Sequence, residues 1–154
     1  IYLADRDLFK IPFDGTTAGT KEKVADLPTI DVSDGARGMV VDGNDGSIYI
    51  LVDYAGITTT RKILRVTSAG VISTAFDFTT RGDAGVQRDL AIDRNLKYLF
   101  TLDTKNNVFL ALGLPSSADP GSLVTFTAAT DPGQASDGGS GDFVGLDIVP
   151  AAGP

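Results

Sequence analysis

Four charged residues stand beside short apolar runs of the chain, where side chains of this type can build a binding site. They are Arg37, Arg88, Asp89 and Asp147. Arg37 and Arg88 each come two residues before the first apolar residue of a run, so we expect them to occupy the same place in two similar segments. Arginine offers planar, bidentate donors that suit an anionic or sugar-like ligand. A polar surface that faces water explains the same residues, and both interpretations stay open.

The residue types that usually carry catalysis are scarce. The chain contains no histidine and no cysteine, and Glu22 is its only glutamate. The usual general base, the thiolate nucleophile and the cysteine ligands of zinc are therefore missing. We expect a non-catalytic protein and assign no catalytic residue.

Two acidic segments resemble loops for a hard cation. Asp42, Asn44 and Asp45 lie close together, and residues 138–142 (GGSGD) resemble one incomplete calcium-binding nonapeptide. Calcium needs about six to eight oxygen ligands, and nonapeptide sites form between stacked copies. Asp, Asn and Gly are also the residues that turns require. We therefore expect turns and loops here, and calcium is the one cation considered; no cofactor is predicted.

Length and composition indicate one domain over residues 1–154. The 154 residues are 42% hydrophobic, which is enough for a packed core. The net charge of −7 without a basic stripe argues against nucleic acid, and no apolar run is long enough to span a membrane. The chain starts at Ile1 and is rich in Asp, Gly and Thr. These features lead us to expect a processed, excised or partly determined polypeptide with an extracellular or cell-surface location.

The elements that position these residues follow a repeat. A motif that ends in Asp reads IYLAD at residues 1–5, YILVD at 49–53 and LFTLD at 99–103, so that Asp53 follows Asp5 by 48 residues and Asp103 follows Asp53 by 50. A second motif, MVVD or LAID, precedes the later two copies. We place the copies at about 1–30, 37–80 and 87–130.

The second copy shows the expected strands most clearly. Strands are predicted at 38–42, 48–53, 62–67 and 71–78, with Asp45-Gly46 as a hairpin turn. Both alternating residue sets of 48–53 are mostly apolar, so this strand is expected to be buried on both faces. Four antiparallel strands with both faces covered are typical of a propeller blade between two others.

The other copies follow the same plan, but the first lacks a strand. The third copy supplies 90–93, 98–103, 107–112 and 123–128, and the first supplies 1–5, 8–13 and 23–27. The missing strand is predicted at 143–150, and its apolar residues are Phe143, Val144, Leu146, Ile148 and Val149. The expected fold is all-β, with about three four-stranded antiparallel blades; a β-sandwich of the same strands is the alternative.

The run GMVVDGNDGSIYILVD at residues 38–53 resembles the NHL-type and gluconolactonase-like β-propeller repeat. Residues 87–103 resemble it with losses: Asp89 replaces the leading Gly, and residues 94–96 replace the Asp-Gly turn. The resemblance implies that the first strand of each blade lines a central channel, which puts Arg37, Arg88, Asp89 and Asp147 near that channel. Gluconolactonase-like enzymes hold a divalent cation there, but no Glu or Asn stands beside the two aspartates of this chain.

Three blades are fewer than the roughly four to eight of closed rings, so we expect the array to be completed from outside. Three arrangements would complete it. Two arcs could pair about a two-fold axis, or the chain could be part of a longer chain. Alternatively, the last strand of one copy could complete the first blade of the next copy, and repetition of this step would build a filament. We therefore expect an extracellular structural or adhesive module that acts by self-association. The alternative is a ligand-binding or cation-dependent lactone-hydrolysing propeller.

Overall fold

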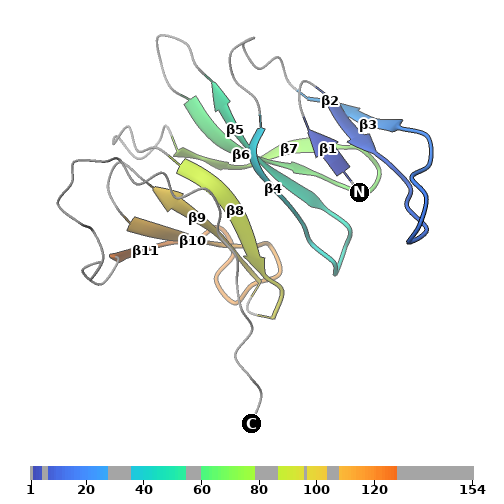
Figure 1. Ribbon diagram of the computed structural model, residues 1–154. Helices are drawn as coiled ribbons and strands as arrows, with labels where there is room; N and C mark the ends of the chain where they lie inside the picture. Colours follow the sequence, from blue (N-terminus) through green and yellow to red (C-terminus); the bar gives the residue numbers. More distant parts are fainter. Residues whose placement is uncertain are drawn as a thin grey trace, which may run out of the picture. The chain divides into compact units, whose positions relative to one another are not determined.

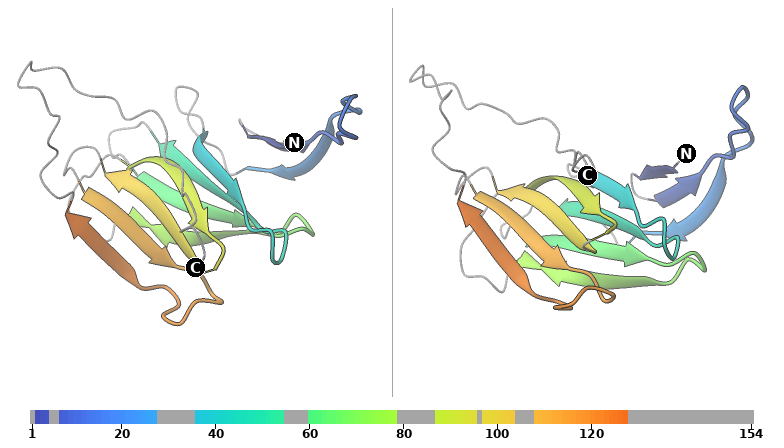
Figure 2. Two further views of the ribbon diagram at one scale, coloured as in Figure 1. Left: turned by 60° about the horizontal axis from the view of Figure 1, so that its bottom comes forward. Right: turned by 90° about the horizontal axis from the view of Figure 1, so that it is seen from below.

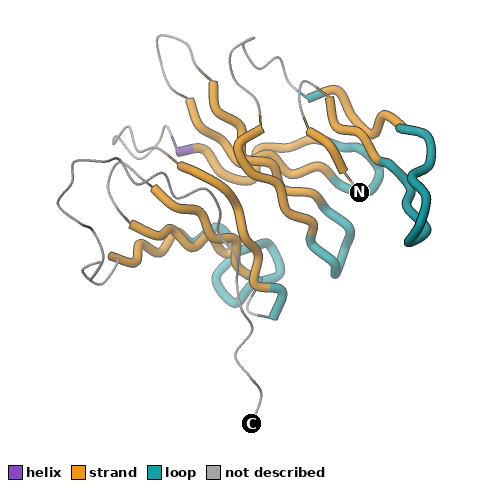
Figure 3. The backbone as a smooth tube through the Cα atoms, viewed as in Figure 1, coloured by secondary structure: helices purple, strands orange, loops and turns teal. Residues whose placement is uncertain are grey.

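The structure is a computed structural model, and it confirms the all-β expectation (Figure 1). Figure 3 shows strands and loops, with one short helical stretch directly after β7. Among the described residues, no helix has the length and the apolar character needed to cross a membrane. The residues that the structure describes are 2–4, 7–27, 36–54, 60–78, 87–95, 97–103 and 108–127.

The described strands form three antiparallel sheets, and every strand expected within these ranges is present. The first sheet has the order β1-β2-β3, the second β4-β5-β6-β7, and the third β11-β10-β9-β8. The strands are β1 (Tyr2–Ala4), β2 (Asp7–Lys10), β3 (Glu22–Asp26), β4 (Ala36–Val41), β5 (Ile48–Tyr54), β6 (Thr60–Val66), β7 (Ile72–Asp77), β8 (Gln87–Asp93), β9 (Tyr98–Asp103), β10 (Val108–Gly113) and β11 (Leu123–Thr127). The expected strand at 143–150, with all its apolar residues, lies outside the described residues.

Contacts within the chain group it into two compact units, Ile1–Ala84 and Gly85–Pro154. The first unit contains the sheets β1–β3 and β4–β7, and the second contains the sheet β8–β11. One domain over 1–154 stays a prediction.

The two sheets of the first unit share one hydrophobic core. Leu8 of β2 is completely buried in it, together with Ile50 and Val52 of β5. Tyr49 and Leu51, on the opposite face of β5, are buried as well. A strand that is buried on both faces needs apolar residues in succession, which explains the continuous run in the sequence. The core consists of Leu8, Ala25, Leu27, Ile48, Ile50, Val52, Leu64 and Val66.

Tyr2 also packs against this core, although the repeat aligns it with Ile50, which belongs to the core itself. In stacked blades, equivalent residues point in the same direction along the stack. If Ile50 points from the second sheet toward the first, its equivalent in the first sheet points away from the second sheet, and Tyr2 does not. The first copy is therefore offset by one residue from the alignment of 1–5 with 49–53, because a shift of one residue exchanges the faces of a strand.

The second unit is a four-stranded sheet with β8 and β11 at its edges (Figure 2). Leu99, Leu102, Leu110 and Ala111 are buried, so both faces of the central strands β9 and β10 are covered. The backbone N–H of Leu114 donates to the carbonyl of Lys97 at 2.9 Å, which extends the pairing of β10 with β9. The N–H of Gly113 donates to the carbonyl of Ser122 at 2.9 Å, and this bond closes the connection to the start of β11.

Candidate functional site

Two of the four candidate residues lie at β-bulges. Arg37 is the extra residue between Ala36 and Gly38 of β4, and Asp89 lies in the bulge between Arg88 and Ala91 of β8. Bulges often stand beside functional sites, because they redirect a side chain. The structure thus gives these two positions a local geometry that an ordinary strand residue does not have.

The register corrects the expected equivalence of Arg37 and Arg88. Ala36 pairs with Val52, and Arg88 pairs with Leu102, which is the equivalent of Val52 in the third copy. Arg88 therefore corresponds to Ala36, and Arg37 corresponds to Asp89. The expectation was wrong because the distance to the first apolar residue does not reveal where a bulge inserts its extra residue.

Asp89 adopts a left-handed backbone conformation with φ of 50°. Its side-chain Oδ1 accepts a hydrogen bond from the backbone N–H of Leu90 at 2.7 Å, and its carbonyl accepts one from Thr101 Oγ1 at 2.9 Å. Such a conformation is uncommon outside glycine and costs about 1–3 kcal/mol. The fully buried Thr101 hydroxyl therefore helps to hold Asp89 in place.

The structure says less about the side chains of Arg37, Arg88 and Asp147. Arg37 is exposed on β4. The backbone of Arg88 belongs to β8, but its side chain lies outside the described part of the structure, as does all of Asp147. The structure therefore does not bring the four residues together into one described site.

A buried polar strip on β8 and β9 was not expected from the sequence. Gln87 and Asp103 are cross-strand neighbours, with 3% and 0% of their surface exposed, and Thr101 lies on the same face. Gln87 Nε2 donates to Asp103 Oδ2 at 3.3 Å, whereas Gln87 Oε1 is buried without a hydrogen-bond partner among the described residues. The recurring Asp of the motif was the one signal that pointed to this place.

The segment with Asp42, Asn44 and Asp45 is a hairpin turn, as the turn interpretation predicted. Asp42 Oδ1 accepts from the Asn44 N–H at 2.9 Å, and Asp45 Oδ1 accepts from the Ser47 N–H at 2.7 Å. Both carboxylates thus serve the backbone of the turn. Within the described ranges, no three acidic side chains gather in a way that would hold a metal ion.

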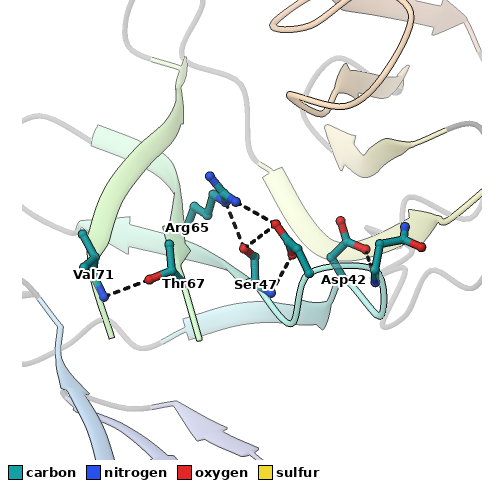
Figure 4. A network of polar contacts seen from close by, with 7 residues as sticks. Asp42, Ser47, Arg65, Thr67 and Val71 are labelled. Carbon is teal, nitrogen blue, oxygen red and sulfur yellow. Dashed lines mark hydrogen bonds and ion pairs between the residues drawn. The ribbon is translucent and has the colours of Figure 1, made fainter. Parts of the chain in front are cut away.

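Arg65 of β6 ties this turn to the next strand (Figure 4). Its Nη2 lies 2.7 Å from Asp45 Oδ2, and its Nε donates to Ser47 Oγ at 3.1 Å. Burial acts to raise the pKa of Asp45, but the hydrogen bonds from Ser47 and the contact with Arg65 outweigh it and hold the pKa below its usual value. The network has a structural role, since it joins the turn between β4 and β5, the residue directly before β5 and the strand β6 of one sheet.

The outer face of the first sheet is charged. Lys23 Nζ of β3 lies 3.3 Å from Asp7 Oδ1 and also pairs with Asp26, and Lys21 Nζ lies 4.1 Å from the ring centroid of Phe9. Asp7 and Asp26 alternate with the core residues of their strands, so this face points away from the core. Hydrogen bonds to Asp26 and Asp7 raise the pKa of Lys23.

Comparison with known proteins supports the fold and not a family. No family model and no curated protein matches the chain. A chain in the crystal structure of a nidogen/laminin complex is similar, with a TM-score of 0.62 and 15% sequence identity over 83% of this chain. The match covers 44% of that longer chain, so this chain spans less than half of its length. The chain therefore has a β-propeller-like, all-β fold, while the NHL-type resemblance stays a prediction.

Proposed function

We propose that the chain is a non-catalytic, extracellular or cell-surface module that acts by self-association. The observation that carries the proposal is the edge of β1. Among the described strands, β1 pairs with β2 alone, so its sheet has three strands where the other two sheets have four. An edge of unpaired N–H and C=O groups is a template for another strand.

The strand that fits this edge is antiparallel to β1. The corresponding strands β4 and β8 run antiparallel to β5 and β9. We propose that residues 143–150 of another copy fill the place, with Val144, Leu146 and Ile148 on one face of the added strand and Phe143 and Val149 on the other. Repetition of this step from copy to copy builds a head-to-tail assembly.

The charged outer face of the first sheet favours strand completion over face-to-face pairing of two arcs. Pairing through that face would bury Lys23, Asp7 and Asp26, and removing charges from water costs several kcal/mol per ion. The similar chain comes from the crystal structure of a nidogen/laminin complex. That supports an association role for such a fold.

Strand completion is tested with a chain that lacks residues 143–154 and a synthetic peptide of the same residues. We expect the truncated chain to lose assembly or stability and the added peptide to restore it, as measured by light scattering and circular dichroism. A control peptide with Leu146→Lys and Ile148→Lys should restore nothing. If truncation changes neither particle size nor stability, the proposal is wrong.

Ligand binding is the second candidate function, and the left-handed Asp89 backbone together with the buried Gln87 Oε1 on the same strand favours it. A cation-dependent, lactone-hydrolysing protein would gain thermal stability with calcium and lose it with a chelator. Asp89→Gly would remove the side chain while keeping the backbone conformation accessible. Absence of any calcium effect on the melting temperature would contradict the cation-dependent, lactone-hydrolysing form of this second candidate.

A further inference from the structure

Among the described strands, each of the three sheets ends in an outer strand, and these outer strands differ in how their free edges are protected. The outer strands are β3, β7 and β11. Natural proteins protect exposed edges with charged residues, bulges or cover, because an unprotected edge pairs with another strand. The three strands therefore offer a comparison within one molecule.

Two of the edges carry such protection. β3 contains Glu22, Lys23 and Asp26, and its pairing with β2 is interrupted by a bulge. The pairing of β7 with β6 is also interrupted by a bulge, and Asp77 of β7 forms an ion pair with Lys62 at 3.0 Å. A strand that approached either edge would meet charge or irregular backbone.

The β11 edge carries neither device. Its sequence, LVTFT, has no charged residue, no proline and no glycine, and it pairs with β10 over five consecutive residues without a bulge. Val124 has 42% of its surface exposed, and Thr125 is exposed as well. The strand combines high β propensity with a regular edge, which is the combination that pairs readily.

We propose that β11 pairs antiparallel with β11 of a second copy, about a two-fold axis at Thr125. This register places Thr125 opposite the partner's Thr125, and two threonines make a favourable cross-strand pair. The two third sheets then form one continuous sheet across the axis. The proposal rests on the proposed self-association and names a second surface for it.

Self-pairing distinguishes β11 from the other outer strands by charge. In β3, the bulge at Val24 puts Glu22 and Asp26 on opposite faces, so a two-fold pairing of this strand with itself would meet an irregular backbone beside the charged Glu22, Lys23 and Asp26. The corresponding arrangement of β7 would place Ile72 opposite the partner's Asp77, an apolar residue against a charge. Only β11 of the three meets itself without such a conflict, and this selects a second copy as its occupant.

The absence of cysteine from the sequence allows a direct cross-linking test. Opposite Cβ atoms in an antiparallel pair lie about 4.5–5.5 Å apart, close to the spacing of a disulfide. Under mild oxidation, Thr125→Cys should give a covalent dimer on a non-reducing gel. The control is Val71→Cys, in the β6–β7 turn, where the valine is 61% exposed and which should stay monomeric on the gel. Equal cross-linking of the two variants, or none in either, overturns the proposal.

A charge test separates this interface from the β1 edge. Thr125→Lys places two lysines opposite each other at the axis, so we expect the native mass to fall at least twofold, whereas Val71→Lys should leave it unchanged. Circular dichroism checks that both variants keep the native spectrum, and the cysteine result decides if Thr125→Lys does not fold. An unchanged mass for folded Thr125→Lys overturns the β11 interface alone. A native chain that is monomeric overturns both this inference and the proposed function.

Discussion

At the scale of single residues, glycines with positive φ form several of the turns, and one of them also touches a neighbouring sheet. Gly70 has φ of 79° in the β6–β7 turn, and a Cβ there would lie 2.8 Å from the carbonyl oxygen of Val24. Gly46 has φ of 72° in the β4–β5 turn, but a Cβ there would meet only ordinary contacts. A comparison of the two glycines therefore separates the energetic cost of the left-handed backbone from the cost of a clash with the neighbouring sheet.

Gly70→Ala should destabilise the protein more than Gly46→Ala. Both changes force alanine into a left-handed conformation at a cost of about 1–2 kcal/mol. Gly70→Ala also pushes a methyl group into the backbone of β3, which adds about 1–3 kcal/mol. Urea denaturation followed by circular dichroism measures the difference, and equal losses would show that the turn does not press on β3.

The Asp45–Arg65 contact should make stability depend on pH. The pKa of Asp45 is held below the usual 3.8, so its contribution is present above that pH and is lost as the pH falls through the folded pKa. Asp45→Asn should be about 0.5–1 kcal/mol less stable at pH 7, since the side chain is 45% exposed. Denaturation curves from pH 7 to pH 2 should show the gap closing below about pH 4. A gap that stays constant with pH would contradict the role of the charge.

At the scale of elements, the core of the first unit joins two sheets through side chains of β2, β3, β5 and β6. β2 continues into a hairpin loop that contains Phe13, which is 53% exposed, whereas Leu8 near its start is fully buried. The same hairpin thus provides a core residue and an exposed residue of comparable apolar character.

Leu8→Ala should cost about 2–5 kcal/mol, because it removes buried methyl groups and leaves a cavity between the sheets. Phe13→Ala should change stability by less than about 0.5 kcal/mol. Thermal melts of both variants provide the measurement. A small loss for Leu8→Ala would mean that the two sheets are not held together by this core.

The sequence predicted the strands well and the site poorly, for identifiable physical reasons. Two-sided apolar runs and Gly-containing turns identified β5 and its hairpin closely, because these signals are local. The bulges at Arg37 and Asp89 were not readable, since a bulge depends on the partner strand. Gln87 was missed because a single glutamine gives no signal of burial, and the free edge of β11 was recognisable only once the strand order was known.

At the scale of the whole molecule, the chain combines compact units with strand edges that lack partners among the described residues. The β1 edge and the β11 edge differ in kind: the first belongs to a three-stranded sheet, and the second to a complete four-stranded one. In the two proposals above, both edges are surfaces for association, and neither proposal requires a catalytic residue or a metal ion.

The mass of the native particle in solution tests this account most directly. Light scattering of the 154-residue chain, with and without a chelator, should give at least twice the 16.0 kDa of one chain, and the chelator should not change the value. A stable particle of 16.0 kDa at all accessible concentrations would contradict self-association.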